Sequence, residues 1–215
     1  VTNGGRILIV VDSDNDGYTS AAIIYQYTVR MNSNCHVDYW LHEGKQHGLQ
    51  DHIDKLMEDN CEYDLIILPD SSSNDAHYHD MLDTIGTPCL ILDHHLTDVK
   101  LSYNAVVVNN QLSPNYHNKE LTGAGVVYQF CRYIDSLTGQ DWANDYIDLA
   151  AWGVIGDMGS MVEMENRYIV YEGLQEKNIK NTFTGMEIHA IHSGIILINL
   201  IRMRIKRKSQ ESSSI

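Results

Sequence analysis

Short apolar runs rich in β-branched residues alternate with helical segments over the first two-thirds of this chain. The predicted strands are residues 6–11, 36–42, 63–69, 88–92 and 105–109. The predicted helices between them are residues 19–31, 49–58 and 75–85. Strands that alternate with helices form βαβ units, in which a parallel sheet is covered on both faces. The sequence therefore predicts an α/β fold with a five-stranded, mostly parallel sheet and helices on both of its faces.

The pattern becomes helical after residue 120 and is lost near residue 184. The predicted helices of this part are residues 122–137, 142–158 and 163–177. A basic run at residues 202–208 and a Ser-rich end follow. We expect a main domain over residues 1–160, a helix or linker over 161–183, and a divergent, partly disordered basic tail over 184–215.

Composition limits the classes of protein that fit. Hydrophobic residues make up 43% of the 215 residues, which is enough for a sizeable core. No apolar run reaches the roughly 20 residues that span a bilayer, and no signal peptide is visible. The four cysteines form no CxxC pair, which argues against a zinc ribbon. We expect a cytoplasmic protein with reduced, mostly buried thiols and no membrane partner.

The distribution of charge bears on the ligand. The formal net charge is −14, and five of the 15 Lys and Arg residues lie within residues 202–208, so the rest of the chain is still more acidic. Such a surface repels a polyanion unless bound cations reverse the local sign. Either nucleic acid is not the ligand, or metal ions form part of the site.

Three carboxylates follow the first predicted strand, at Asp12, Asp14 and Asp16. Ligands of open α/β sheets bind beyond the carboxyl ends of strands, and clustered carboxylates need cations or raised pKa values. A helix cap is one alternative, although it needs only one of the three residues. A calcium loop of the EF-hand type is excluded because its twelfth position, Ile23, carries no carboxylate. A haloacid-dehalogenase-type phosphatase fits the three-carboxylate spacing less well.

Further candidate metal ligands lie directly after two other predicted strands and at the end of a predicted helix. They are Asp70 after the third strand, Asp93-His94-His95 after the fourth, and Asp157 at the end of an apolar helix. The alternatives are an ordinary turn, a surface histidine pair and a solvated helix end. If the strands are neighbours, however, these side chains converge on one pocket.

The mixture of carboxylate and imidazole suits manganese, iron or zinc better than calcium. The set exceeds what one ion needs, so we expect two divalent ions roughly 3.5–4 Å apart, bridged by a carboxylate. Such a pair supplies a hydroxide nucleophile at neutral pH and stabilises both ends of an in-line displacement at phosphorus.

The order of these motifs resembles that of the DHH phosphoesterase family over about residues 5–180. The matching motifs are D-x-D-x-D-G at residues 12–17, Asp70, Asp93-His94-His95, and G-D at residues 156–157. Asp at the first position resembles the RecJ branch of single-strand-specific 5′→3′ exonucleases. The small-residue helix start at residues 121–127 and the segments at 166–168 and 172–174 also resemble that branch.

The resemblance implies a Rossmann-like DHH catalytic domain over residues 1–160 and a role for each candidate. Asp12 and Asp14 would bind the first ion, Asp16, His94 and Asp157 the second, and Asp70 both. The ions would be manganese, with magnesium as the alternative. His95 would lie beside the metals or touch the substrate phosphate, and Asp93 would orient the imidazoles. The catalytic candidates are therefore Asp14, Asp16, Asp70, His94, His95 and Asp157.

Two features leave the substrate open. The Gly-Gly-x-His-type motif of the family's second domain is absent from the sequence, where Gly4-Gly5 is the only Gly-Gly pair. The segment 43–48, with Lys45 and His47, is a candidate for substrate contact, and an ordinary surface loop is the alternative.

The leading hypothesis is a manganese-dependent exonuclease that hydrolyses single-stranded DNA from the 5′ end. The alternatives are a phosphoesterase for short oligonucleotides, cyclic dinucleotides or pyrophosphate, and a non-catalytic nucleic-acid scaffold.

Overall fold

The computed structural model describes residues 4–44, 46–58, 62–97, 100–175 and 178. Its sheet has the strands β1 (Gly5–Val11), β2 (Cys35–Leu41), β3 (Leu65–Pro69), β4 (Cys89–Asp93) and β5 (Ala105–Asn109). Their order is β2-β1-β3-β4-β5, and each neighbouring pair is parallel. The predicted five-stranded α/β sheet is confirmed, and it is parallel throughout.

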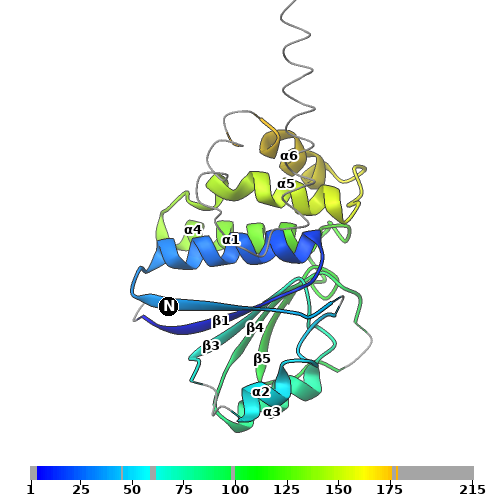
Figure 1. Ribbon diagram of the computed structural model, residues 1–215. Helices are drawn as coiled ribbons and strands as arrows, with labels where there is room; N and C mark the ends of the chain where they lie inside the picture. Colours follow the sequence, from blue (N-terminus) through cyan, green and yellow to red (C-terminus); the bar gives the residue numbers. More distant parts are fainter. Residues whose placement is uncertain (1–3, 45, 59–61, 98–99, 176–177, 179–215) are drawn as a thin grey trace, which may run out of the picture. The chain divides into compact units, whose positions relative to one another are not determined.

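Helices cover both faces of this sheet, as predicted (Figure 1). They are α1 (Asn15–Met31), α2 (Ile53–Glu58), α3 (Ala76–Thr84), α4 (Gly123–Thr138), α5 (Ile147–Gly156) and α6 (Met164–Gly173). Helices α1 and α4 lie on one face and α2 and α3 on the other. Helix α5 packs against α1 and α4, and α6 packs against α5, so the first face carries a second helical layer.

Several helices begin at residues other than those predicted, for local reasons. Helix α1 begins at Asn15 instead of residue 19, because the side chain of Asp14 accepts a 2.9 Å hydrogen bond from the backbone N–H of Gly17 and caps the helix. Helix α2 begins at Ile53 because residues 50–52 form a turn. The predicted helix 142–158 starts as a 3₁₀ helix over Ala143–Tyr146 and continues as α5.

The core is built from the apolar side chains of the strands and of the helices packed on them. The central strands contain fully buried side chains, Leu8, Ile9, Ile66 and Leu68. This agrees with the prediction that these segments are buried parallel strands. Cys35, Cys89 and Cys131 are buried, as predicted. Cys61 and the predicted tail, residues 184–215, lie outside the described residues. Within the described part, no helix has the length and apolarity that a membrane span requires.

The strand order determines where a ligand can bind. The chain leaves β1 toward β2 at one edge, whereas it leaves β3 toward β4 and β5 at the other. In a sheet of this order the two connections diverge between β1 and β3, and a crevice opens beyond the carboxyl ends of those strands. Asp12 follows β1 and Asp70 follows β3, so both lie at this crevice.

Candidate metal centre

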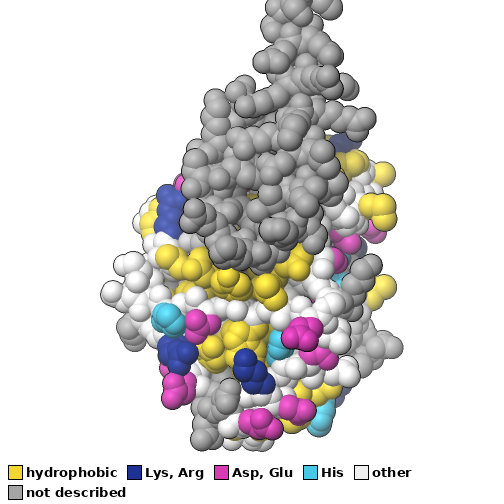
Figure 2. Space-filling view, in the orientation of Figure 1, with side chains coloured by type: hydrophobic (Ala, Val, Ile, Leu, Met, Phe, Trp, Pro, Cys, Tyr) yellow, Lys and Arg dark blue, Asp and Glu magenta, His cyan; other side chains and the backbone are white. Residues whose placement is uncertain are grey.

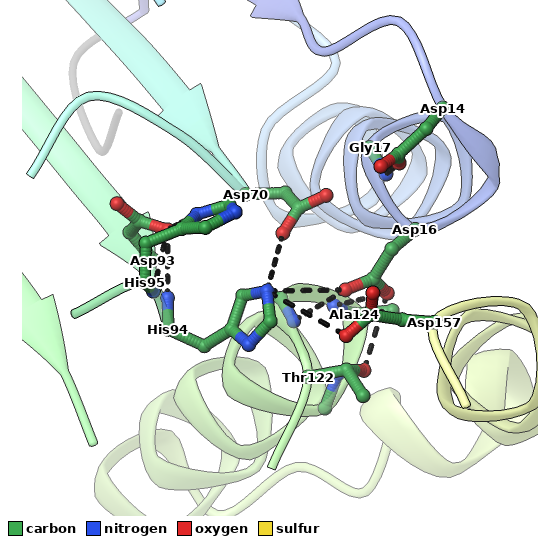
Figure 3. Close-up of polar contacts among 12 residues, drawn as sticks. Asp14, Asp16, Gly17, Asp70, Asp93, His94, His95, Thr122, Ala124 and Asp157 are labelled. Carbon is green, nitrogen blue, oxygen red and sulfur yellow. Dashed lines mark hydrogen bonds and ion pairs between the residues drawn. The ribbon is translucent and has the colours of Figure 1, made fainter. Parts of the chain in front are cut away.

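Carboxylate and imidazole side chains gather at the carboxyl edge of the sheet (Figure 3). They come from the residues after β1, β3 and β4 and from the end of α5. Ligand atoms of three groups lie within 4.8 Å of one another: Asp12, Asp14 and Asp70; Asp16, His94 and Asp157; and Asp70, His94 and His95. The structure thus brings together all seven of these candidates. Asp70 and His94 each belong to two groups, so the groups are adjacent.

His94 lies at the middle of the cluster. Its Nε2 is 3.2 Å from Oδ1 of Asp70, 3.8 Å from Oδ2 of Asp16 and 3.9 Å from Oδ2 of Asp157. These three carboxylates come from β3, α1 and α5, so one imidazole faces three separate elements (Figure 3). The spacing leaves Nε2 available to a cation that the carboxylates would share.

The N-terminus of α4 holds the carboxylate of Asp16. That carboxylate accepts hydrogen bonds from the hydroxyl of Thr122 at 3.1 Å, the N–H of Gly123 at 2.6 Å and the N–H of Ala124 at 3.0 Å. Backbone N–H groups and the helix dipole both favour a negative charge at this position. This role was not predicted from the sequence, although the small-residue helix start at residues 121–127 indicates it.

Glycine at position 123 allows the close approach of two elements. A Cβ atom there would lie 2.1 Å from Oδ1 of Asp70, which is far inside van der Waals contact. The backbone of α4 can therefore reach Asp70 on one side and Asp16 on the other only because residue 123 has no side chain.

The electrostatics of the cluster favour a bound cation. Burial, together with the charges of Asp16, Asp14 and Asp12, raises the pKa of Asp70 well above its usual range. Oδ1 of Asp70 is buried and accepts no hydrogen bond from the described residues. Burial also raises the pKa of Asp12 to about 6, although its hydrogen bond with His47 opposes the shift. Such carboxylates are costly to bury without compensation, and divalent cations would supply it.

Two of the three remaining carboxylates of the cluster have pKa values shifted in the same direction. Burial raises the pKa values of Asp16 and Asp157. The oxygen-rich donor set with added imidazole is one that manganese and related divalent ions accept. The residues present therefore fit a pair of divalent ions.

Asp93 contacts His95, a histidine of the cluster, and does not itself belong to the three groups of candidate ligands. It accepts hydrogen bonds from the N–H groups of Ser73 and His94 at 2.9 and 2.7 Å, and its Oδ1 lies 2.7 Å from Nδ1 of His95. Burial alone would raise the pKa of Asp93, but the hydrogen bonds from His95 and Ser73 outweigh it and hold the pKa below its usual range. The same contact raises the pKa of His95. Asp93 thereby fixes which ring nitrogen of His95 remains for other contacts.

His47 contacts a carboxylate of the cluster. Its Nδ1 lies 2.8 and 2.7 Å from the two oxygens of Asp12. The loop after β2 therefore reaches the centre, and contact of His47 with substrate stays a prediction. Lys45, the other predicted contact in this loop, lies outside the described residues.

Comparison with known proteins identifies the family of this fold and site. The model of the DHH family, N-terminal domain, matches residues 6–154. The chain is 40% identical over 176 residues to a putative SPbeta prophage-derived single-strand DNA-specific exonuclease, YorK, of Bacillus subtilis. It is 31% identical over 175 residues to the single-stranded-DNA-specific exonuclease RecJ of Thermus thermophilus. These matches cover 82% and 80% of this chain but only 30% and 25% of the relatives.

The comparison extends to solved structures. A crystal structure of exonuclease RecJ bound to manganese superimposes with a TM-score of 0.70 and 26% identity, covering 80% of this chain and 43% of that one. The segment that matches the DHH family model contains nearly all of the strands β1 to β5 and the Asp and His residues described above except Asp157, which lies just beyond it. The chain belongs to the DHH family and corresponds to the catalytic-domain portion of RecJ-like proteins.

Proposed function

We propose that this protein is a metal-dependent phosphodiesterase that hydrolyses single-stranded DNA from the 5′ end. The observation that carries the proposal is the convergence of Asp12, Asp14, Asp16, Asp70, His94, His95 and Asp157 at one edge of the sheet. The relatives are named as single-strand DNA-specific exonucleases, which supports this choice of substrate.

The described residues suit two adjacent divalent ions, of which manganese is the first choice and magnesium the second. Asp12 and Asp14 would hold one ion and Asp16, His94 and Asp157 the other, with Asp70 between them. Such ions supply positive charge that stabilises the entering and leaving oxygens of an in-line displacement. The manganese in the related RecJ structure supports this choice of metal.

The remaining residues of the site orient the groups that touch substrate. Asp93 holds the imidazole of His95, whose side chain is 52% exposed, at the edge of the cluster. An imidazole in this place can donate a hydrogen bond to a phosphate oxygen. Asp14 and Asp157 are exposed, whereas Asp12, Asp16 and Asp70 are buried, so the cluster is open to solvent on the side of Asp14 and Asp157.

The charge of the site explains why cations are needed for a polyanionic substrate. The ion pairs of the centre that the structure describes join only Asp and His side chains. Arg6 lies near the first residue of β1 and pairs with Asp38, and Arg30 lies near the last residue of α1 and pairs with Asp145. Both arginines are therefore at the ends of these elements that point away from the centre. On the face shown in Figure 2, the Lys and Arg side chains are scattered among acidic ones and form no continuous track. Bound metal ions would therefore provide the local positive charge.

A nuclease assay with purified protein tests the proposal. We expect 5′-labelled single strands to release labelled mononucleotides in manganese, with no release in EDTA. Duplexes and circular single strands of the same sequence should resist cleavage. Failure to release nucleotides from any single strand, at any protein concentration, would contradict the proposed activity.

Two variants and a matched control connect this activity to the centre. His94→Ala and Asp70→Asn should reduce the rate by about 10²-fold or more, because each removes a shared ligand. Asp54→Asn changes an exposed carboxylate on α2 and should keep the wild-type rate. Full turnover by His94→Ala would show that the hydrolysis takes place elsewhere.

A second candidate is a phosphoesterase for short oligonucleotides or other small phosphate esters. The acidic charge of the chain and the scattered cations on the face shown in Figure 2 favour it, because a long strand needs phosphate contacts along its length. A series of strands from two to thirty nucleotides separates the two activities. A rate that is highest for dinucleotides and falls with length would favour the small substrate.

A further inference from the structure

A largely apolar pocket of about 330 Å³ lies between β5 and α4, and none of the candidate metal ligands lines it. The end of β5, the loop that follows it and one side of α4 form its wall, with Val108, Asn110, Tyr116, Leu121, Val126 and Tyr133 among the lining residues. Within the described part of the chain, no Lys, Arg, Asp or Glu lines it. Apolar pockets of this size with a small number of fixed polar groups are typical of binding sites.

Two polar side chains of the pocket wall are bound to a carboxylate of α6. The hydroxyl of Tyr116 donates to Oε1 of Glu165 at 2.7 Å, and Nε2 of Gln129 donates to the same oxygen at 2.6 Å. Because both groups are directed to one carboxylate, a ligand in the pocket meets mainly their carbon atoms. These contacts explain how a wall that includes Tyr and Gln can be largely apolar.

Asn110 differs from these residues because one of its polar atoms has no partner. Its side-chain amide donates to the carbonyls of Asn118 and Leu121 at 3.1 and 3.2 Å, which fixes the orientation of the group. Its Oδ1 is buried and accepts no hydrogen bond from the described residues, although Asn110 is only 4% exposed. A buried acceptor without a partner is costly, and a ligand that brings a donor to this wall would satisfy it.

The pocket adjoins a free edge of the sheet. β5 is the last strand in the sheet order, so its backbone pairs with β4 on one side and with no described strand on the other. Val106 is 63% exposed and lies on the same face of β5 as Val108, because side chains alternate along a strand. Tyr133 of α4, which lines the pocket, is 61% exposed. An exposed apolar surface therefore extends from the edge strand to the pocket, an arrangement that suits an added strand whose side chain enters a neighbouring pocket.

The chemistry of the pocket favours tryptophan among the large side chains. The indole N–H only donates, so it satisfies Oδ1 of Asn110 and leaves no polar atom of its own unpaired. The hydroxyl of a tyrosine would bring an oxygen that also needs a donor, and phenylalanine has no donor. A charged side chain would find no opposite charge on the described wall.

The tryptophans of this sequence are themselves engaged. They are Trp40, Trp142 and Trp152, and the residues outside the described part contain none. Trp152 is buried. Lys55 lies over the ring of Trp40 and Arg30 over that of Trp142, and both rings are half-buried. Neither a second copy nor another segment of this sequence therefore offers a free indole, so the fitting occupant is a different protein.

We propose that the pocket between β5 and α4 binds a tryptophan side chain of a partner protein, whose extended segment pairs with the free edge of β5. The indole N–H donates to Oδ1 of Asn110, and apolar residues of the segment cover Val106 and Tyr133. This inference assigns an interaction surface and does not depend on the proposed function.

A small indole probe tests the pocket itself. N-acetyl-tryptophanamide is titrated into the isotopically labelled chain and followed by NMR, and we expect a Kd of about 1–10 mM with the largest shifts at Asn110, Leu121 and Val126. The derivative methylated at the indole nitrogen should bind at least about threefold more weakly, because the hydrogen bond to Asn110 is lost. Equal binding of the two probes, shifts confined to other residues, or no shifts at all would overturn the inference.

Peptides selected from a random linear display library test the extended segment. Those that bind the wild-type chain should share a tryptophan, and replacing it by alanine should raise Kd by about tenfold or more. A bound peptide should also slow hydrogen exchange at the amides of β5, whereas N-acetyl-tryptophanamide alone should not. Selected peptides that lack tryptophan, or that bind without protecting β5, would contradict the proposed mode of binding.

Variants of the chain test the location of the site. Ser113→Phe fills the pocket from a half-buried position and should raise the Kd of a selected peptide by about tenfold or more. Ser136→Phe adds the same ring at an exposed position of α4 and should keep the wild-type Kd. Tyr133→Ala removes an exposed ring from the rim and should raise Kd about threefold, which provides a second test if circular dichroism shows Ser113→Phe to be unfolded.

The outcomes distinguish this partner from other occupants. A folded Ser113→Phe variant that binds the selected peptides as wild type does would place their site elsewhere and overturn the inference. Sedimentation of the chain alone tests a second copy. Self-association of the wild type that is lost in Ser113→Phe would assign the pocket to an interface between copies and would also overturn the inference.

Discussion

Oδ2 of Asp16 accepts a 2.6 Å hydrogen bond from the backbone N–H of Gly123, the first residue of α4. The two residues are 107 positions apart in the sequence, so this bond joins the first and fourth helices at the candidate metal centre. Gly123 also lies against Asp70, where a Cβ atom would be 2.1 Å from Oδ1. The first turn of α4 therefore sets the spacing between Asp16 and Asp70, and hence between the two groups of ligands.

Substitution of Gly123 by Ala tests that spacing. The added Cβ must displace Asp70, so we expect Gly123→Ala to weaken manganese binding by about tenfold or more. Isothermal titration calorimetry measures the affinity, and circular dichroism shows whether the variant is folded.

Gly125→Ala is the matched control on the same helix. Its Cβ would lie 2.4 Å from Cδ1 and 2.7 Å from Cγ of Leu121, so it presses on an apolar side chain and not on a carboxylate of the centre. Gly125→Ala should therefore keep the wild-type affinity. Equal affinities for Gly123→Ala and wild type would show that Asp70 and Asp16 do not depend on the close approach of α4.

Asp70→Asn should have opposite effects on stability without and with metal. In EDTA at pH 8, removal of a buried carboxylate whose pKa is raised by burial should increase the free energy of unfolding by about 1–3 kcal/mol. In manganese, the wild type should gain more stability than Asp70→Asn, because binding to the folded state shifts the unfolding equilibrium. Urea denaturation under both conditions measures the difference.

The exposed carboxylate of Asp54 provides the comparison for charge alone. Asp54→Asn should match wild type in both conditions, since its side chain lies on the surface of α2. An Asp70→Asn variant that is less stable than wild type in EDTA would contradict the interpretation of Asp70 as an uncompensated buried charge.

The sheet was predictable because parallel strands that are buried on both faces consist of continuous apolar residues, which are visible in the sequence. Continuous apolar runs such as residues 6–11 and 63–69 have few alternative structures, and the helices between them constrain the strands to be parallel. The candidate ligands were predictable for the same reason, since Asp70 and His94 directly follow such runs. The proximity of these ligands then depended only on β1, β3 and β4 being neighbours, as they are.

Contacts between distant segments were not predictable from one sequence. The N–H groups of Gly123 and Ala124 that hold Asp16 are backbone groups, which any residue except proline carries. Asn110 resembles an ordinary turn residue in the sequence, and only its burial at the wall of a pocket distinguishes it. Helix starts were also shifted, because capping by Asp14 depends on backbone geometry as well as residue type.

We expect His79 to make the stability of the protein sensitive to acid. It is buried in α3, neither ring nitrogen has a hydrogen-bond partner among the described residues, and burial lowers its pKa. The folded state thus favours the neutral imidazole. The neutral imidazole therefore contributes fully to the free energy of unfolding at pH values above the unfolded pKa of about 6.5, and this contribution is lost as the pH falls below that value. We expect the free energy of unfolding in EDTA to fall less between pH 7.5 and pH 5 for His79→Leu than for wild type.

His77 lies two residues away on the same helix and is exposed, so it serves as the control. His77→Gln should show the wild-type dependence on pH. If His79→Leu and wild type lose the same stability between the two pH values, burial of His79 does not account for the acid sensitivity.

His47 positions a metal-facing carboxylate from outside the cluster. Its Nδ1 lies within 2.8 Å of both oxygens of Asp12, which is buried, so the imidazole restrains the direction of that carboxylate. Side chains that orient metal ligands typically contribute about 10- to 100-fold to metal affinity or activity. We therefore expect His47→Ala to weaken manganese binding by about tenfold, measured by calorimetry, and to lower kcat on single strands. His47→Gln can still donate a hydrogen bond to Asp12 and should recover part of the affinity, whereas a residue that only touched substrate would change KM and leave metal affinity intact.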